Sequence, residues 1–299
     1  MSALLLAQVG TPQGHHLAIA LALLAAVLHA LFGALQKGRD DPWIARAAID
    51  ASYGIIAAPF ALFVVPWPEP HMWLIFAWAF LIHSGYKIAQ ATTYDRAPYT
   101  VVYPVVRGTG PFFTVLFAGL VFGEHFLALQ WLGLGLLLAG IFGLAGHSLW
   151  QLGNQAASLL PALGLALLTG GFVAGYTTFD AWGIRTTADP FTFLAWFFMI
   201  DGVFIPAITW RRWIGLTADR IPALLKRGLF GAFIAFFSFG AVMLATRLDR
   251  VGEAATLRET STVFAALIGW WVLGEKVGPV RGGLMGLIAL GAVVMETAG

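Results

Sequence analysis

The sequence predicts an all-α integral membrane protein of ten transmembrane helices, arranged as two inverted five-helix repeats. Three observations support this fold class: an apolar composition, a series of apolar segments of helix length, and one pattern that occurs twice. The chain has 299 residues, of which 59% are hydrophobic and 11% charged, and its mean hydropathy is +0.82. A water-soluble domain cannot bury that much apolar surface, so lipid is the expected solvent.

Composition also excludes several kinds of chemistry. The chain has no cysteine, which excludes disulfides, thiolate metal sites and cysteine nucleophiles. The basic residues lie in short loops that flank the spans, so no nucleic-acid partner is predicted. A cleavable signal peptide is not expected, because no Lys or Arg precedes the first apolar run and Pro12 and Gly14 interrupt it.

Ten segments are long and apolar enough to cross a bilayer, which requires about 20 residues. They are separated by charged residues, Pro and Gly, and lie near 16–36, 43–65, 71–93, 99–122, 127–147, 158–181, 190–210, 222–246, 254–273 and 279–297. The connections are short, and only 211–221 leaves room for a surface segment.

One sequence pattern around the fourth predicted helix occurs twice. Residues 94–124 and 248–275 each consist of a short polar turn, an apolar helix with an arginine, and a terminal Gly-Glu. A shift of 151 positions superposes Arg107 on Arg258, Gly123 on Gly274 and Glu124 on Glu275. The Asp-Pro-aromatic sequence at 41–43 recurs at 189–191. The chain is therefore a duplication, with an N-terminal unit at 1–150 and a C-terminal unit at 151–299.

Each unit contains five predicted spans, which is an odd number. Two homologous units with an odd number of spans enter the membrane from opposite sides when a short link joins them. The repeats are therefore expected to be inverted, related by a pseudo-two-fold axis in the membrane plane. Such an arrangement suits alternating access.

Polar residues inside the third span indicate a candidate site, because each ionisable group costs roughly 2.5–3.5 kcal/mol in a membrane and requires a partner or a cavity. His83, Lys87, Gln90 and Tyr94 recur at helical spacing, with Tyr86 beside Lys87. This stripe is expected to face protein or water. An alternative interpretation is that Lys87 extends to the membrane surface.

Three other spans carry similar groups. The fourth places Tyr103 and Arg107 at the same spacing, and Pro104 and Pro111 predict a break in that helix. The sixth and ninth add further polar side chains. The predicted substrate-binding residues are Tyr86, Lys87, Gln90, Tyr103, Arg107, Tyr176, Arg258 and Glu259. The candidates for ion coupling are His83, Glu259 and Asp180. Of these, His83 and Glu259 are the groups best able to change charge near neutral pH.

The mixture of charges indicates the class of substrate. Lys87 and Arg107 on one half, with Glu259 and Asp180 on the other, provide sites for both a carboxylate and an ammonium group. This suits a small polar or zwitterionic metabolite. An organic anion held by arginine, or a quaternary ammonium compound held by aromatic rings, remains an alternative. Arg107 and Arg258 also have the alternative role of pairing with carboxylates to pin helices. No cofactor or metal ion is predicted.

The ten-span layout, the repeated arginine helix ending in Gly-Glu, and the glycine-rich helix that follows it resemble the drug/metabolite transporter superfamily, specifically its EamA-type members. The resemblance covers almost the whole chain. It implies a small-molecule carrier, often an exporter of amino acids or related metabolites, with a cavity lined mainly by helices 1, 3, 4, 6, 8 and 9. A channel is less favoured because no carbonyl-rich loop repeats. An enzyme is less favoured because Gly-x-Ser-x-Gly and His-Glu-x-x-His are absent from the sequence.

Two glycines on the last span indicate how helices or subunits pack together. Gly282 and Gly286 have GxxxG spacing, which allows helices to approach closely. They are expected either to pack the two repeats together or to support a homodimer, so both a monomer and a homodimer are compatible with the sequence.

Basic residues outside the spans are unevenly distributed between the two sides of the membrane. One side has three, namely Arg185, Arg247 and Arg250. The other side has eleven: Lys37, Arg39, Arg46, Arg96, Arg211, Arg212, Arg220, Lys226, Arg227, Lys276 and Arg281. Because Lys and Arg in short loops stay in the cytoplasm, the charges place both termini outside, in a plasma (inner) membrane protein. The resemblance implies the opposite orientation, with both termini inside.

Overall fold

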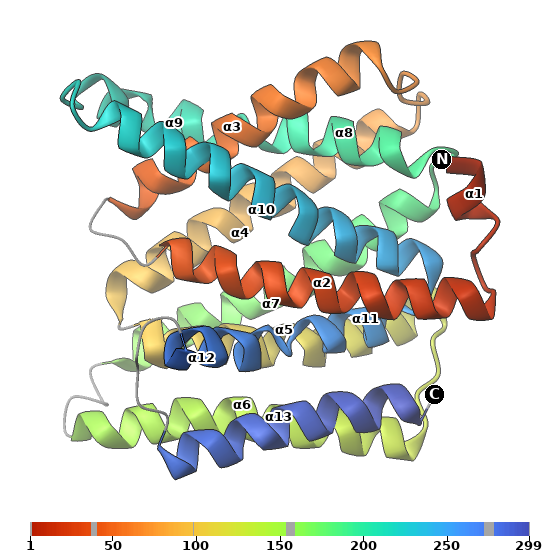
Figure 1. Ribbon diagram of the computed structural model, residues 1–299, viewed down its shortest axis with the longest axis vertical. Helices are drawn as coiled ribbons and strands as arrows, with labels where there is room; N and C mark the ends of the chain where they lie inside the picture. The colour runs from red at the N-terminus through yellow and green to blue at the C-terminus, as the bar shows by residue number, and fades with distance from the viewer. Residues whose placement is uncertain (1, 37–40, 98, 154–158, 272–277, 299) are drawn as a thin grey trace.

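The computed structural model describes residues 2–36, 41–97, 99–153, 159–271 and 278–298, and all regular secondary structure in these ranges is helical. The helices are α1 (Ser2–Leu6), α2 (Pro12–Gln36), α3 (Pro42–Phe63), α4 (Met72–Arg96), α5 (Tyr99–Phe122), α6 (Ala128–Leu152), α7 (Leu160–Arg185), α8 (Pro190–Asp201), α9 (Phe204–Ile214), α10 (Ile221–Leu248), α11 (Val251–Arg258), α12 (Ser261–Trp271) and α13 (Pro279–Thr297). They run back and forth between two ends of the bundle (Figure 1). The predicted fold class is confirmed.

Nine stretches within the described ranges are long and apolar enough to cross a membrane, and one of them, Pro190–Ile214, contains both α8 and α9. α11 and α12 are shorter, and together they take the place of the predicted ninth span. Large apolar side chains such as Ile55, Leu120 and Phe233 are exposed on the outer surface. Lipid is the medium in which such a surface is stable, and the chain is a multi-pass membrane protein.

The packing of the helices shows the inverted repeat. α2, the first span of one half, packs against α10 and α12, whereas α7, the first span of the other half, packs against α4 and α5. These partners are the third and fourth spans of the opposite half in each case. The second spans, α3 and α8, pack on each other, as do the fifth spans, α6 and α13. In Figure 1, α2 begins near the two chain termini and α7 begins at the opposite end.

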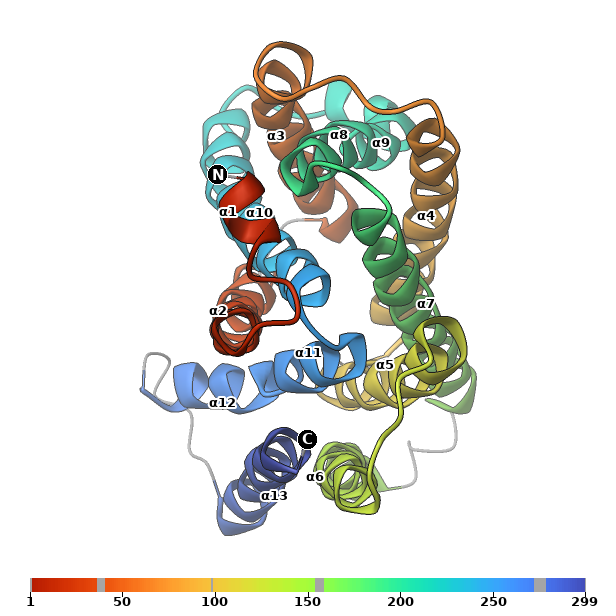
Figure 2. The same ribbon diagram turned by 90° about the vertical axis from the view of Figure 1, so that its right-hand side faces the viewer.

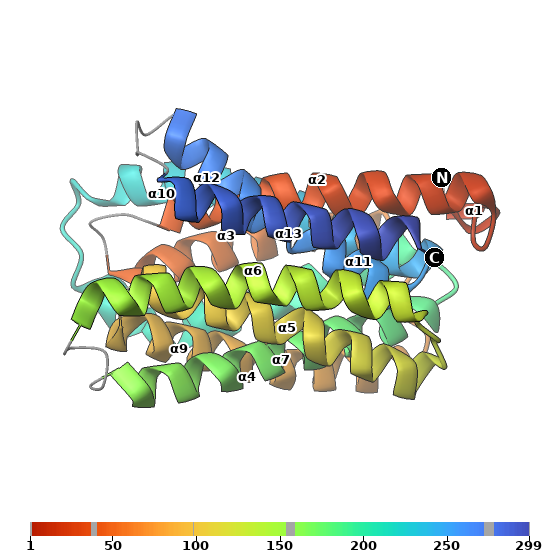
Figure 3. The same ribbon diagram turned by 90° about the horizontal axis from the view of Figure 1, so that it is seen from below.

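The two ends of the bundle are called here the terminus side and the opposite side. The terminus side carries both termini and the loops 64–71, 123–127, 186–189 and 249–250 (Figures 1 and 2). Seen from this side, α6 and α13 form a separate pair below a row made by α12, α11 and α5 (Figure 2). The same pair lies nearest the viewer in Figure 3.

The recurring Asp-Pro-aromatic sequence starts the second span of each half. The Asp41 carboxylate accepts a hydrogen bond from the Trp43 backbone N–H at 2.8 Å, and the Asp189 carboxylate accepts one from that of Phe191 at 2.9 Å. The proline after each aspartate occupies the first helical turn, where its missing N–H has no cost. The same local chemistry thus begins α3 on the opposite side and α8 on the terminus side.

The prediction of a break in the fourth span is wrong, because α5 runs without interruption through Pro104 and Pro111. The ninth span is interrupted instead, between Arg258 and Ser261. There the hydroxyls of Thr260 and Thr262 donate to the backbone carbonyls of residues 257 and 259 at 2.7 and 2.9 Å. Hydroxyl groups that bond the local backbone compete with the regular helix, which explains the position of the break.

The seventh span is also interrupted, between Asp201 and Phe204. A Cβ atom on Gly202 would lie 2.7 Å from both the Asp50 carbonyl oxygen and the Gly54 Cα atom. Only glycine allows α3 to approach this closely. The break brings the backbone of Asp201 beside α3 and leaves its carbonyl oxygen available to a side chain.

Glycines also set the packing of α6 on α13. A Cβ atom on Gly291 would lie 2.5 Å from the Leu137 backbone nitrogen and 2.6 Å from the Gly133 carbonyl oxygen. Gly282 and Gly286 have open space around them instead. The GxxxG pair therefore does not pack the two repeats together, whereas Gly291 does.

Candidate functional site

Buried charged side chains lie at the centre of the bundle, on α3, α4, α5, α7, α8 and α11. The described groups fall into three ionic clusters. Since an ion without a partner is very costly in a membrane, the way in which each charge is balanced decides what this region can bind.

The first cluster surrounds Lys87, whose side chain is 1% exposed. Its Nζ atom lies 2.8 Å from Asp50 Oδ2 and 2.9 Å from Asp201 Oδ2. Nζ also donates to the Tyr53 hydroxyl at 3.1 Å and to the Asp201 backbone carbonyl at 2.9 Å, the carbonyl made available by the break after α8. The ammonium group is thus fully surrounded by oxygen atoms of this protein.

Arg46 and Tyr53 complete this first cluster. Arg46 donates from Nε to Asp50 at 2.7 Å, and the Tyr53 hydroxyl donates to Asp201 at 2.5 Å. Two cations and two carboxylates therefore balance one another. Arg46, which the sequence placed among the loop charges, is turned into the bundle with a side chain only 17% exposed.

The second cluster joins the two repeat-equivalent arginines through one carboxylate. Arg107 Nε lies 2.7 Å from Glu259 Oε2, and Arg258 Nη2 lies 3.6 Å from Glu259 Oε1. Arg107 also donates to the Ser261 hydroxyl at 3.0 Å, at the start of α12. Two guanidinium groups share a single carboxylate, so the cluster retains one positive charge.

The third cluster pairs His83 with Asp180 and is enclosed by aromatic rings. His83 Nε2 lies 2.8 Å from Asp180 Oδ2. The His83 ring lies 4.6 Å from that of Tyr176 and 4.9 Å from that of Phe197, measured between centroids. The second oxygen of Asp180 is buried without a hydrogen bond. With a neutral histidine, this cluster retains one negative charge.

Two crevices adjoin these clusters. The Arg46 crevice is lined by Arg46, Tyr53, His83, Tyr86, Phe197, Phe198, Asp201, Ala235 and Phe239. The Asp180 crevice is lined by Tyr176, Thr177, Asp180, Ala181, Phe239, Val242, Met243, Thr246 and Arg258. The side chains leave room for roughly one water molecule in each. Around these two crevices, the described side chains therefore leave little free space in this conformation.

The Asp180 crevice has a polar lining that is incompletely bonded. Asp180 Oδ1, Arg258 Nε and the Thr177 hydroxyl are buried and have no hydrogen-bond partner. The Asp180 and Arg258 side chains are each 4% exposed. Unpaired polar atoms at this depth are costly, so a ligand that supplied both a donor and an acceptor would be favoured.

The structure brings most of the predicted site residues close together. Lys87, Arg107, Arg258, Glu259, His83 and Asp180 belong to the three clusters, and Tyr176 lines the Asp180 crevice. Tyr86 lines the Arg46 crevice and accepts a hydrogen bond from Gln90 at 2.6 Å. Tyr103 lies beneath the Arg107 guanidinium, with 5.9 Å from Cζ to the ring centroid. Their roles in binding and coupling stay predictions.

Sequence reasoning missed Arg46, Asp50, Tyr53 and Asp201 as members of the site. For the two aspartates the sequence did contain a sign of a shared site. The shift of 151 positions that superposes Arg107 on Arg258 also superposes Asp50 on Asp201. Ionisable residues at equivalent positions of two repeats are candidates for a shared site on the pseudo-two-fold axis.

Glu124 has a structural position on the terminus side. Gly123 ends α5 with a φ of 67°, a left-handed conformation that glycine adopts readily. The Glu124 carboxylate then accepts hydrogen bonds from the backbone N–H groups of Val251 at 2.6 Å and Gly252 at 3.1 Å. These are free donors at the N-terminus of α11. The repeat-equivalent Gly274 and Glu275 lie outside the described residues.

Comparison with known proteins identifies the class of this membrane protein. The family model described as the EamA-like transporter family matches residues 16–146 and 160–297, one match in each half. The chain therefore belongs to the EamA-like transporter family. The doubling of the match agrees with the two inverted repeats.

One further comparison is informative about the fold only. A solved structure titled "Crystal structure of protein" is similar with a TM-score of 0.73 and 18% sequence identity, covering 95% of this chain and 98% of that one. No curated protein matches the chain. The family is one of transporters.

Proposed function

We propose that this protein is a secondary transporter that moves a small polar or zwitterionic metabolite, similar to an amino acid, across the plasma (inner) membrane by alternating access. Export is proposed as the direction because the family resemblance implies it. The substrate class rests on the buried charges of the three clusters.

The observation that carries this proposal is the Asp180 crevice. One carboxylate, Asp180, and one guanidinium, Arg258, line the same small space with unpaired polar atoms. The first cluster is neutral, so with a neutral His83 the surplus charges of the centre are the negative charge of Asp180 and the positive charge beside Glu259. A substrate with an ammonium and a carboxylate group satisfies both, and an apolar substituent fits against Phe239, Val242 and Met243.

The break in the ninth span supports alternating access. Arg258 and Glu259 lie at the junction of α11 and α12, so a change in the angle between these two helices would move both charges. Discontinuous helices at the interface between inverted repeats are a frequent feature of carriers. The two crevices lined by described residues are too small for a metabolite, so its binding requires such a movement.

Counterflow in proteoliposomes tests the proposal. Vesicles that contain the full-length protein and an unlabelled amino acid should accumulate the same labelled compound transiently, because a carrier exchanges substrate. Arg258→Gln should abolish this accumulation and leave the folded yield unchanged. Accumulation of only organic anions, or only quaternary ammonium compounds, would replace the zwitterion by one of those classes. Flux without counterflow would contradict a carrier.

The proposed orientation has both termini outside the cytoplasm. It is supported by the basic residues of the opposite side, of which Lys37, Arg39 and Lys276 lie outside the described residues. Removing Arg46, which is turned inward, still leaves ten basic residues on that side against three on the terminus side.

A further inference from the structure

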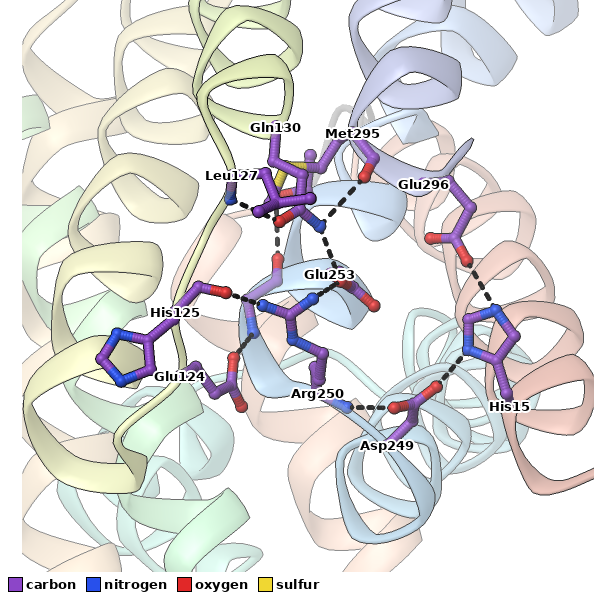
Figure 4. A network of polar contacts seen from close by, with 12 residues as sticks. His15, Glu124, His125, Leu127, Gln130, Asp249, Arg250, Glu253, Met295 and Glu296 are labelled. Atoms are coloured by element: carbon purple, nitrogen blue, oxygen red, sulfur yellow. Dashed lines mark hydrogen bonds and ion pairs between the residues drawn. The ribbon is translucent and has the colours of Figure 1, made fainter. Parts of the chain in front are cut away.

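A group of ionisable residues lies on the terminus side, away from the central clusters. Its members are His15 on α2, Asp249 between α10 and α11, Glu253 on α11 and Glu296 on α13 (Figure 4). Ligand atoms of His15, Asp249 and Glu253 lie within 4.8 Å of one another. Glu296 approaches from the other side, with its Oε1 atom 3.5 Å from His15 Nε2.

Two carboxylates of this group, those of Glu253 and Glu296, are largely buried, and that of Glu296 is incompletely paired. Both carboxylate oxygens of Glu296 are buried and receive no hydrogen bond. The Glu253 side chain is 7% exposed and that of Glu296 15%. Asp249, Glu253 and Glu296 line one crevice together with Arg250 and the apolar side chains of Ala18, Ile19, Ala254 and Leu257. A carboxylate in such surroundings requires a cation nearby.

With His15 neutral, the side chains of this group carry a surplus of negative charge. Arg250 Nη1 lies 2.5 Å from Glu253 Oε1, to which Gln130 Nε2 also donates at 2.8 Å. Figure 4 shows these two donors on one side of Glu253, with its other oxygen directed toward His15 and Glu296. Three carboxylates and one arginine give a charge of −2 when His15 is neutral.

Two other arginines lie nearby without altering this balance. Arg185 donates to the Asp249 backbone carbonyl at 2.6 Å, and Glu124 lies 4.0 Å from its guanidinium group. Arg247 donates to the backbone carbonyls of residues 185 and 187. Among the described residues, neither arginine pairs with a carboxylate oxygen of the group.

We propose that His15, Asp249 and Glu253 form a binding site for one divalent transition-metal ion of the Zn²⁺ or Mn²⁺ type, with Glu296 facing the other ring nitrogen of His15. One imidazole and two carboxylates are a donor set suited to such ions, and an ion of charge +2 neutralises the group when His15 is neutral. Glu296 then orients His15, and Arg250 and Gln130 orient Glu253, as outer partners of metal ligands commonly do. The ion and Glu296 together join α2 of the first half to α11 and α13 of the second.

Metal binding to the full chain, freed of any affinity tag and treated with EDTA, tests this site. Titration calorimetry with ZnCl₂ should show one ion per chain. Asp249→Asn and Glu296→Gln should each weaken binding by about 10- to 100-fold or more, the loss typical of a disrupted metal site. His16→Ala and Glu69→Gln are matched controls, because they remove the neighbouring exposed histidine and an acidic residue of the same side. They should leave binding unchanged.

X-ray absorption of the Zn²⁺-loaded wild-type protein identifies the ligands of the ion without the use of variants, so it still tests the site if a variant fails to fold. It should show one imidazole nitrogen with carboxylate oxygens. Binding that is unaffected by Asp249→Asn and Glu296→Gln, a zinc shell with two or more imidazoles, or no binding by the wild type would overturn the proposal. If stability instead depended on pH and not on Zn²⁺, a protonated His15 would be the cation.

Discussion

Asp50 and Asp201 occupy equivalent positions in the two repeats, and their carboxylates bind the same ammonium group from opposite halves. Lys87 Nζ lies 2.8 Å from Asp50 Oδ2 and 2.9 Å from Asp201 Oδ2. A symmetric pair of acids thus binds a lysine that has no equivalent, since a shift of 151 positions from Lys87 reaches Ser238. The two halves therefore differ at Lys87, the residue whose ammonium group both aspartates contact.

Removing this lysine should destabilise the protein. Lys87→Met leaves Asp201 with the Tyr53 hydroxyl as its remaining side-chain donor, and breaking a buried ion pair costs roughly 3–5 kcal/mol. We expect a lower melting temperature in detergent, with Lys226→Met as a control that removes an exposed lysine. The double variant Lys87→Met, Asp201→Asn should recover much of the loss, because it removes the unpaired charge. Normal stability of the single variant would show that Lys87 is not a structural cation.

The repeat and the spans were predictable because they depend on local sequence. Apolar length marks the helices, and the recurrence of Arg107 as Arg258 reveals the duplication. The contacts of Lys87 were not predictable in this way, because Asp201 lies 114 positions away and reaches it only through packing of α8 on α3. The break at Gly202 depends equally on close approach to Gly54, which single-helix patterns do not report.

The predicted break of the fourth span at two prolines was wrong because neighbouring helices also decide whether a proline interrupts a helix. Pro104 and Pro111 suggested a broken helix, yet a transmembrane helix tolerates proline where neighbouring groups satisfy the backbone. The run of Glu, Thr and Ser at 259–262 was a better sign of a break, since its hydroxyls bond the local backbone. Local hydroxyl chemistry thus located the break better than proline did.

The proposed substrate orientation predicts a selective loss of affinity. Asp180→Asn removes the carboxylate that would receive the ammonium group of the substrate, and a hydrogen bond to a charged group contributes about 1.5–3 kcal/mol. An amino acid that binds the wild type should bind this variant roughly 10- to 100-fold more weakly, whereas its deaminated analogue should bind equally to both. Equilibrium binding to the detergent-solubilised protein measures this.

Asp219→Asn is the matched control for this experiment, because Asp219 is an exposed aspartate on the opposite side. It should change the affinity for neither compound. Equal losses for the amino acid and its analogue in Asp180→Asn would mean that Asp180 maintains the shape of the crevice and does not contact the ammonium group.

Two glycines of α13 should respond differently to the same substitution. Gly291→Ala places a methyl group 2.5 Å from the Leu137 backbone nitrogen, which must move apart from α13, and overpacking of this kind costs about 1–3 kcal/mol. Gly286→Ala meets open space and should be neutral or slightly stabilising. Melting temperatures of the two variants provide the comparison. Equal destabilisation would show that Gly286 contacts another molecule, as in a homodimer.

The distribution of basic residues predicts the orientation in the membrane. Eleven Lys and Arg residues were assigned to the opposite side and three to the terminus side, and the structure turns only Arg46 of the described ones into a central ion pair. All three on the terminus side are engaged, Arg185 and Arg247 with backbone carbonyls and Arg250 with Glu253. Because short basic loops stay in the cytoplasm, alkaline phosphatase fused to the C-terminus should be active and a fluorescent protein there should be dark. A fusion that ends in the 215–220 loop should behave oppositely. A bright C-terminal fusion would place the termini inside and show that the charge distribution does not decide the orientation of this family member.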